Sequence, residues 1–231
     1  MRSRFTIAFS FASLFLVAAL GWSQGSYKAV VGSAPNASQI PQSIQSTLES
    51  QGVQFENAQG APLCEIWWRK GIPTQKSPAA SSDVLYGGLS MGEFVGVIYF
   101  PSASKDYRGQ AIKPGYYTLR YGLIPQDGNH MGVSSYRDFL LLIPIASDSN
   151  PTQDLSFNDL VKASRLTTGT GHPAVMMLDP VSQNSGSKLP AAVQDDQGNW
   201  ALDVNLDTKP AGGGAEQPLP FAMVLVGQYQ G

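Results

Sequence analysis

Two histidines are the side chains best suited to chemistry in this sequence. His130 lies in a glycine-containing segment with Asp127 and Met131, and His172 lies in a second such segment, four residues before Met176. Imidazole and thioether ligands together suit copper, Cu(I) in particular, and a carboxylate suits another divalent ion. One hypothesis is therefore a site for copper or another divalent metal formed by His130, His172, Met131, Met176 and Asp127. The alternative is that both imidazoles hydrogen-bond only within their own loops and that no cofactor is bound.

The metal hypothesis requires the two histidine segments to meet. Each segment comes just before an apolar stretch expected to be a strand, 138–143 or 174–178, and a helix is expected between them. If the two strands are parallel, the helix forms a crossover and both histidine segments lie at the same end of the sheet. The single cysteine, Cys64, lies far upstream, so the loop that gathers Cys, His and Met in blue-copper proteins is absent.

A second group of candidate residues is charged. Arg120 interrupts an aromatic and apolar stretch, and Arg137 with Asp138 opens an apolar one. Charged side chains remain near a core when they are paired, so structural Arg–Asp pairing is one interpretation. The other is a clamp for an anionic ligand formed by Arg108, Arg120, Arg137 and Asp138, because a guanidinium binds a carboxylate through two parallel hydrogen bonds.

Aromatic side chains on strands provide a third candidate surface. Trp67 and Tyr116 are expected to face away from their more apolar neighbours. Aromatic rings exposed on a sheet can stack on sugar rings, which makes a bound glycan an alternative ligand.

Catalytic motifs give no support for an enzyme. The sequence contains no Gly-x-Ser-x-Gly, no His-Glu-x-x-His and no phosphate-binding loop. Glu65 and Glu93 could form a glycosidase pair, but nothing in their spacing requires it. We therefore expect no catalytic residues, with a small secreted enzyme as an alternative.

Composition restricts the class of protein. Charged residues make up 14% of the 231 residues, against about 25% in average domains, and 24 glycines and 16 prolines indicate a turn-rich chain. The net charge is −2 without a basic cluster, which argues against nucleic-acid binding. Cys64 alternates in phase with Ile66 and Trp68, which predicts a small buried hydrophobic side chain.

The N-terminal segment is typical of an export signal. Arg2 and Arg4 precede an apolar run, residues 5–20, and small residues follow at 21 and 23. This pattern predicts a signal peptide over residues 1–23, because the run is shorter than the ~20 residues that span a bilayer. We expect the remaining residues, 24–231, to form a single β-rich domain that is periplasmic or extracellular, with no transmembrane segment after cleavage.

Hydrophobic periodicity predicts many strands and two short helices. Residues 94–100 and 138–143 are apolar on both alternating faces, which indicates strands covered on both sides. Helices are expected over 39–51 and, after a capping box at Ser156 and Asp159, over about 156–166. The other expected strands are 53–57, 63–70, 116–123, 174–178, 200–206 and 221–226, and flexible loops are expected near 71–83 and 208–219.

These elements predict a mainly β fold. The expected architecture is an antiparallel-rich β-sandwich with the two short helices in its connections. The alternative is a mixed α+β sheet.

Three segments in the middle of the chain resemble a family of exported bacterial β-rich proteins of unknown function. They are GYYTLRYG at 115–122, PQDGNHMG at 125–132 and RDFLL at 137–141. The resemblance implies export and a β-rich domain, and it assigns no catalytic residues.

Together these observations predict an exported, non-catalytic protein. It binds a small molecule, a glycan or an envelope protein, or it has a structural role in the cell envelope. The alternatives are a periplasmic metal-binding protein that uses His130 and His172, a carbohydrate-binding protein and a small secreted enzyme.

Overall fold

The computed structural model describes residues 26–36, 38–75, 81–127, 134–183 and 188–227. The predicted signal peptide, 1–23, lies outside these ranges, as do His130 and Met131. No helix in the described part of the chain is long and apolar enough to cross a membrane.

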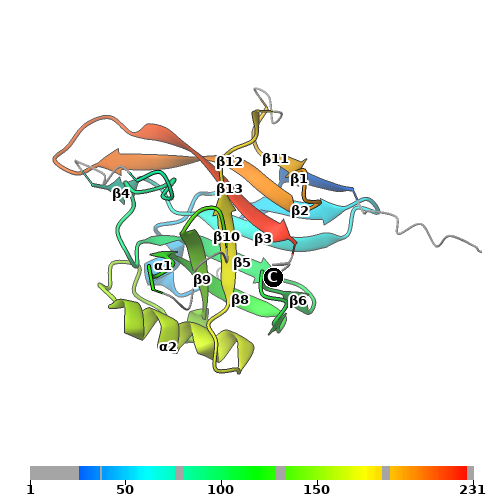
Figure 1. Ribbon diagram of the computed structural model, residues 1–231, viewed down its shortest axis with the longest axis horizontal. Helices are drawn as coiled ribbons and strands as arrows, with labels where there is room; N and C mark the ends of the chain where they lie inside the picture. Colours follow the sequence, from blue (N-terminus) through cyan, green and yellow to red (C-terminus); the bar gives the residue numbers. More distant parts are fainter. Residues whose placement is uncertain (1–25, 37, 76–80, 128–133, 184–187, 228–231) are drawn as a thin grey trace, which may run out of the picture.

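The fold is mainly β, with a large curled sheet and two helices, as predicted (Figure 1). Strands follow one another across the sheet in the order β1-β2-β3-β5-β8-β9-β10-β13-β12-β11. All pairings on this path are antiparallel, and β4 joins β12 in parallel at one edge. The strands are β1 (Tyr27–Val31), β2 (Val53–Asn57), β3 (Pro62–Trp68), β4 (Ile72–Thr74), β5 (Phe94–Phe100), β6 (Ser104–Lys105), β7 (Ala111–Ile112), β8 (Gly115–Leu123), β9 (Asp138–Pro144), β10 (Val175–Asp179), β11 (Ala191–Gln194), β12 (Trp200–Pro210) and β13 (Gln217–Val226), and β6 and β7 form a separate small ribbon.

The sheet folds into two layers at β10. The first three residues of β10, 175–177, pair with β9, whereas Leu178 and Asp179 pair with β13. This change of partner lets the β11–β13 layer lie over the layer that contains β2, β3, β5 and β8 (Figure 1). The two layers also meet where the ring of Tyr27 on β1 lies against that of Trp200 on β12, with centroids 5.4 Å apart. The main core fills the space between the layers.

Both helices cover outer faces of the first layer. In β9, Leu140 and Leu142 face the main core, while Phe139 and Leu141 pack outward with Leu160 of α2 (Phe157–Thr168). The short helix α1 (Gln42–Gln45) and its flanking residues cover β3 and β5 in the same way. This cover on both faces explains why β5 and β9 are apolar on both alternating sets, as predicted.

Several local predictions differ from the structure. The helix expected over 39–51 is reduced to Gln42–Gln45. Ile40, Ile44 and Leu48 are buried as the spacing predicts, but the Thr47 hydroxyl donates to the Ile44 carbonyl at 2.7 Å and Leu48 pairs with Arg69 of the neighbouring strand segment. These contacts satisfy the backbone without a further helical turn.

The expected loops are also shorter than predicted. The range 71–83 contains β4, and β12 and β13 extend into 208–219 and leave only residues 211–216 between them. The short strands β1 and β11 carry little apolar patterning, and the sequence did not predict them.

Cys64 is free and completely buried on β3, as predicted. Burial raises the pKa of its thiol, and the nearby Glu65 raises it further, so the nucleophilic thiolate does not form at neutral pH. We expect an aromatic disulfide reagent at pH 8 to label no cysteine in the native protein and one in urea. Rapid labelling of the native protein would contradict this packing.

Candidate functional site

A cavity of about 690 Å³ lies between α2 and the outer face of β9 and β10. Its floor is apolar and includes Phe139 and Met177, both nearly completely buried. Phe157 and Val161 of α2 also line it, as does Ile124, which follows β8. The cavity is thus built from segments that are far apart in the sequence.

The sequence of α2 explains how the helix lines this cavity. Phe157, Val161 and Arg165 recur every four residues and therefore share one helical face, and all three line the cavity. The neighbouring face, with Leu160 and Ser164, is buried against the sheet. Ser156 caps the helix, as predicted. The helix continues to Thr168, beyond the expected end near 166, and Gly169 follows it as a left-handed C-cap.

The turn at 106–110 is fastened to the segment that precedes β10. The buried carboxylate of Asp106 accepts hydrogen bonds from the Gln110 backbone N–H at 2.7 Å and from its side-chain Nε2 at 2.8 Å. Gln110 Nε2 also donates to the Pro173 carbonyl at 3.0 Å, and Gln110 Oε1 accepts from the Thr170 hydroxyl at 2.6 Å. Burial raises the pKa of the Asp106 carboxyl above its usual value, although the bonds from Gln110 act in the opposite direction. These contacts fix the backbones that carry Arg108 and His172 side by side.

Three basic side chains lie around this cavity: Arg108, His172 and Arg165. All three residues are exposed. Among the described residues, none of these side chains forms an ion pair or a hydrogen bond, and no Asp or Glu lines the cavity. The arrangement combines an apolar floor with hydrogen-bond donors and positive charge on its rim. We refer to Arg108, Arg165 and His172 as the basic rim.

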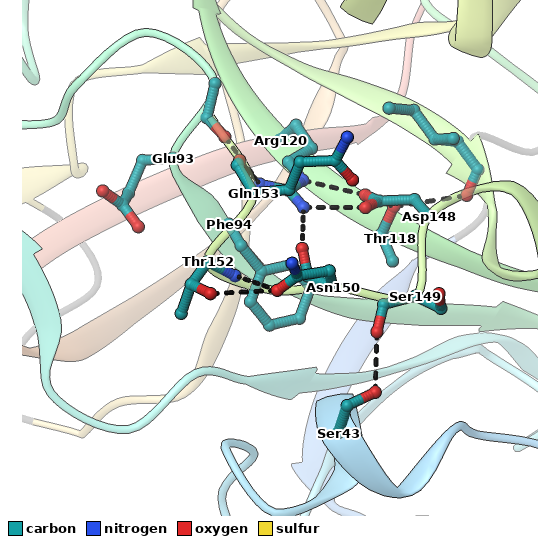
Figure 2. Close-up of polar contacts among 12 residues, drawn as sticks. Ser43, Glu93, Phe94, Thr118, Arg120, Asp148, Ser149, Asn150, Thr152 and Gln153 are labelled. Atoms are coloured by element: carbon teal, nitrogen blue, oxygen red, sulfur yellow. Dashed lines mark hydrogen bonds and ion pairs between the residues drawn. The ribbon is translucent and has the colours of Figure 1, made fainter. Parts of the chain in front are cut away.

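Arg120 has a different environment, because its guanidinium is buried and fully bonded within the protein (Figure 2). Nε and Nη2 donate to the two carboxylate oxygens of Asp148 at 2.8 and 2.7 Å. The other donors reach the carbonyls of Gly92, Gln153 and Asn150 at 3.0, 3.3 and 2.7 Å. A guanidinium has five N–H groups, and these five bonds use all of them, which leaves none for a ligand.

Arg120 therefore positions the segment that leads into α2. Its bonds to residues 148, 150 and 153 hold this segment along the sheet, and Ser43 of α1 donates to the Ser149 carbonyl at 2.6 Å (Figure 2). α2 begins a few residues later, so the cavity wall depends on this buried ion pair.

Arg137 and Asp138 are likewise engaged within the protein. Asp138 is completely buried and accepts hydrogen bonds from the Tyr121 hydroxyl and two backbone N–H groups. Arg137 Nε donates to the Ile124 carbonyl at 2.8 Å, and Arg137 Nη1 lies 3.8 Å from Asp83. Of the four predicted clamp residues, only Arg108 lines the cavity. The clamp as a set of four stays a prediction.

The parallel arrangement assumed for the metal site is wrong. β9 and β10 are antiparallel neighbours, so the segments that precede them lie at opposite ends of the pair. Met176 is buried in the main core, whereas Met177 on the opposite face lines the cavity with His172. Asp127 is exposed.

Within the described residues, no group of three or more His, Cys, Asp or Glu side chains could hold a metal ion. Because His130 and Met131 lie outside the described ranges, the metal site stays a prediction.

The predicted aromatic surface is partly covered. Trp67 is only 2% exposed and stacks on Tyr116, with ring centroids 6.3 Å apart. A buried Trp67 offers no ring face to a sugar. Glu65 accepts hydrogen bonds from Ser33, and Glu93 is paired with Arg69 at 2.5 Å, so each carboxylate has a protein partner of its own.

Comparisons of the chain with protein-family models, with curated proteins and with solved structures gave no match.

Sequence reasoning named Arg108 as a clamp residue and His172 as a metal ligand, but it did not predict the cavity that both of them line. The recurrence of Phe157, Val161 and Arg165 was a usable signal, because it marks a second face of α2 beside the buried one. The contribution of Tyr107 gave no such signal, because it depends on the turn at 106–110 being bonded to a distant segment.

Proposed function

We propose that this chain is an exported, non-catalytic protein that binds a small molecule with an apolar body in the cavity beneath α2. The cavity itself is the observation that carries the proposal. Its volume of about 690 Å³ falls within the ~300–1,000 Å³ of ligand pockets, which are lined mostly by apolar and aromatic side chains with a few polar groups. Export is supported by the N-terminal sequence pattern.

A larger side chain at one position of α2 can fill the cavity. Val161 lines it and is half-buried, while the adjacent Lys162 is exposed and does not line it. We expect Val161→Trp to fill the cavity and to weaken binding of the neutral fluorophore N-phenyl-1-naphthylamine at least tenfold. Fluorescence titration measures this affinity, and thermal unfolding checks that the variant is folded.

The control is Lys162→Trp, which adds the same ring one position along the helix. Its affinity for the fluorophore should stay within twofold of the unchanged protein. Absence of fluorophore binding, or equal affinity in the Val161→Trp variant, would refute a binding site at this place.

A further inference from the structure

We infer that the ligand of this cavity is an amphipathic carboxylate, with its apolar chain on the floor and its carboxylate at the basic rim. The inference rests on the proposed function and adds the charge and the head group of the ligand.

The apolar part of the ligand follows from the floor and walls. Phe139, Met177, Phe157 and Val161 present aromatic and aliphatic carbon to the cavity. Burial of apolar area provides affinity for a hydrocarbon chain but carries no preference for its head group.

The anionic head group follows from the basic rim. Arg108, Arg165 and His172 come from three segments: the turn at 106–110, the last turn of α2 and the segment before β10. The hydrogen bonds of Gln110 to Thr170 and Pro173 fix two of these segments to each other. The fold therefore holds the backbones that carry Arg108 and His172 next to each other, and Arg165 lies in the last turn of α2, which lines the same cavity.

The charge around the cavity is opposite in sign to the net charge of the chain. The whole chain has a net charge of −2, yet the described residues that line the cavity include two arginines and a histidine and no acidic residue. Arg120 and Arg69 have carboxylate partners at 2.7 and 2.5 Å, whereas Arg108 and Arg165 have none among the described residues. Their donors remain available for an external carboxylate, whose planar geometry a guanidinium matches.

The test compares three ligands that each have ten carbons and differ in the charge and chemistry of the head group: decanoate, 1-decanol and decylamine. Each is titrated calorimetrically below its micelle concentration at pH 7.5 and low salt. Decanoate should bind at least tenfold more tightly than either of the others, and its affinity should fall as salt is raised.

Variants that remove positive charge test whether the preference for a carboxylate comes from the basic rim. Arg108→Gln combined with Arg165→Gln should weaken decanoate at least tenfold and leave 1-decanol within twofold. Lys162→Gln, which removes one positive charge from α2 outside the cavity, should change neither affinity.

The outcomes separate the inference from the proposed function. Equal affinity for decanoate and 1-decanol, both abolished by Val161→Trp, would overturn the inference and leave the binding site in place. An unchanged decanoate affinity in the double glutamine variant would also overturn it. No binding of any of the three ligands would reject both.

Discussion

Replacing Arg120 by methionine is expected to lower the free energy of unfolding by about 3–5 kcal/mol, the range for breaking a buried ion pair from one side. The side chains of Arg120 and Asp148 are each only 1% exposed. Removal of the guanidinium leaves the Asp148 carboxylate in the interior with one remaining side-chain donor, the Thr118 hydroxyl at 2.6 Å. Three carbonyls, at residues 92, 150 and 153, also lose their donor.

Urea unfolding followed by tryptophan fluorescence measures this loss. The control is Arg108→Met, which removes the same group from an exposed position and should change stability by less than about 0.5 kcal/mol. Adding Asp148→Asn to the Arg120 variant should restore part of the loss, because the isolated buried charge is then gone. A decrease in the free energy of unfolding of less than about 1 kcal/mol, as for an exposed ion pair, would mean that the ion pair of Arg120 and Asp148 does not stabilise the fold as a buried pair.

Asp138 is expected to be the second most sensitive position, with Asp138→Ala lowering stability by about 3 kcal/mol. The carboxylate accepts from the backbone N–H groups of Leu85 and Tyr86 at 2.8 and 2.9 Å and from the Tyr121 hydroxyl at 2.6 Å. Each buried donor left without an acceptor costs about 1–3 kcal/mol. Burial and the bond to Asp138 both raise the pKa of Tyr121, so its hydroxyl remains a donor at neutral pH.

Chemical denaturation of two variants tests this role. Asp138→Asn keeps one acceptor oxygen and should be less destabilising than Asp138→Ala. Asp196→Ala removes a carboxylate from the exposed turn before β12 and should have little effect. If the alanine variants at 138 and 196 are equally stable, the hydrogen bonds to Asp138 contribute nothing to the fold.

Strands with strong local patterns were predictable from the sequence. The predicted bounds 53–57 and 94–100 coincide with β2 and β5, because alternation and continuous apolar runs report directly which faces are buried. β4 was not predictable in this way. It contains Pro73, and it exists because its residues pair with the distant end of β12.

Hydrophobic periodicity could not predict the direction of β10, because this direction depends on the path that the chain takes between β9 and β10. The Leu155 carbonyl and Leu160 lie against Gly92, whereas the Thr167 hydroxyl, near the other end of α2, donates to the Leu142 carbonyl at 2.7 Å. α2 therefore runs in the same direction as β9, and the segment that Arg120 binds has already carried the chain back along the sheet. β10 then starts beside the end of β9 and runs antiparallel to it.

The candidate site was predictable only in part, because its residues come together only through the path of the folded chain. Arg120 and Asp138 stood out as charges within apolar strands, and they are internal anchors. Arg108 and His172 belong to the cavity, but only the folded chain brings them near Phe157 and Arg165.

The change of partner within β10 has a consequence for how the molecule loses its structure. Residues 175–177 complete the hydrogen bonding of β9, and residues 178–179 do the same for β13. Separating either layer would remove the hydrogen-bond partners from one part of β10. It would also expose the core that both layers share. We therefore expect the two layers to melt as one cooperative unit.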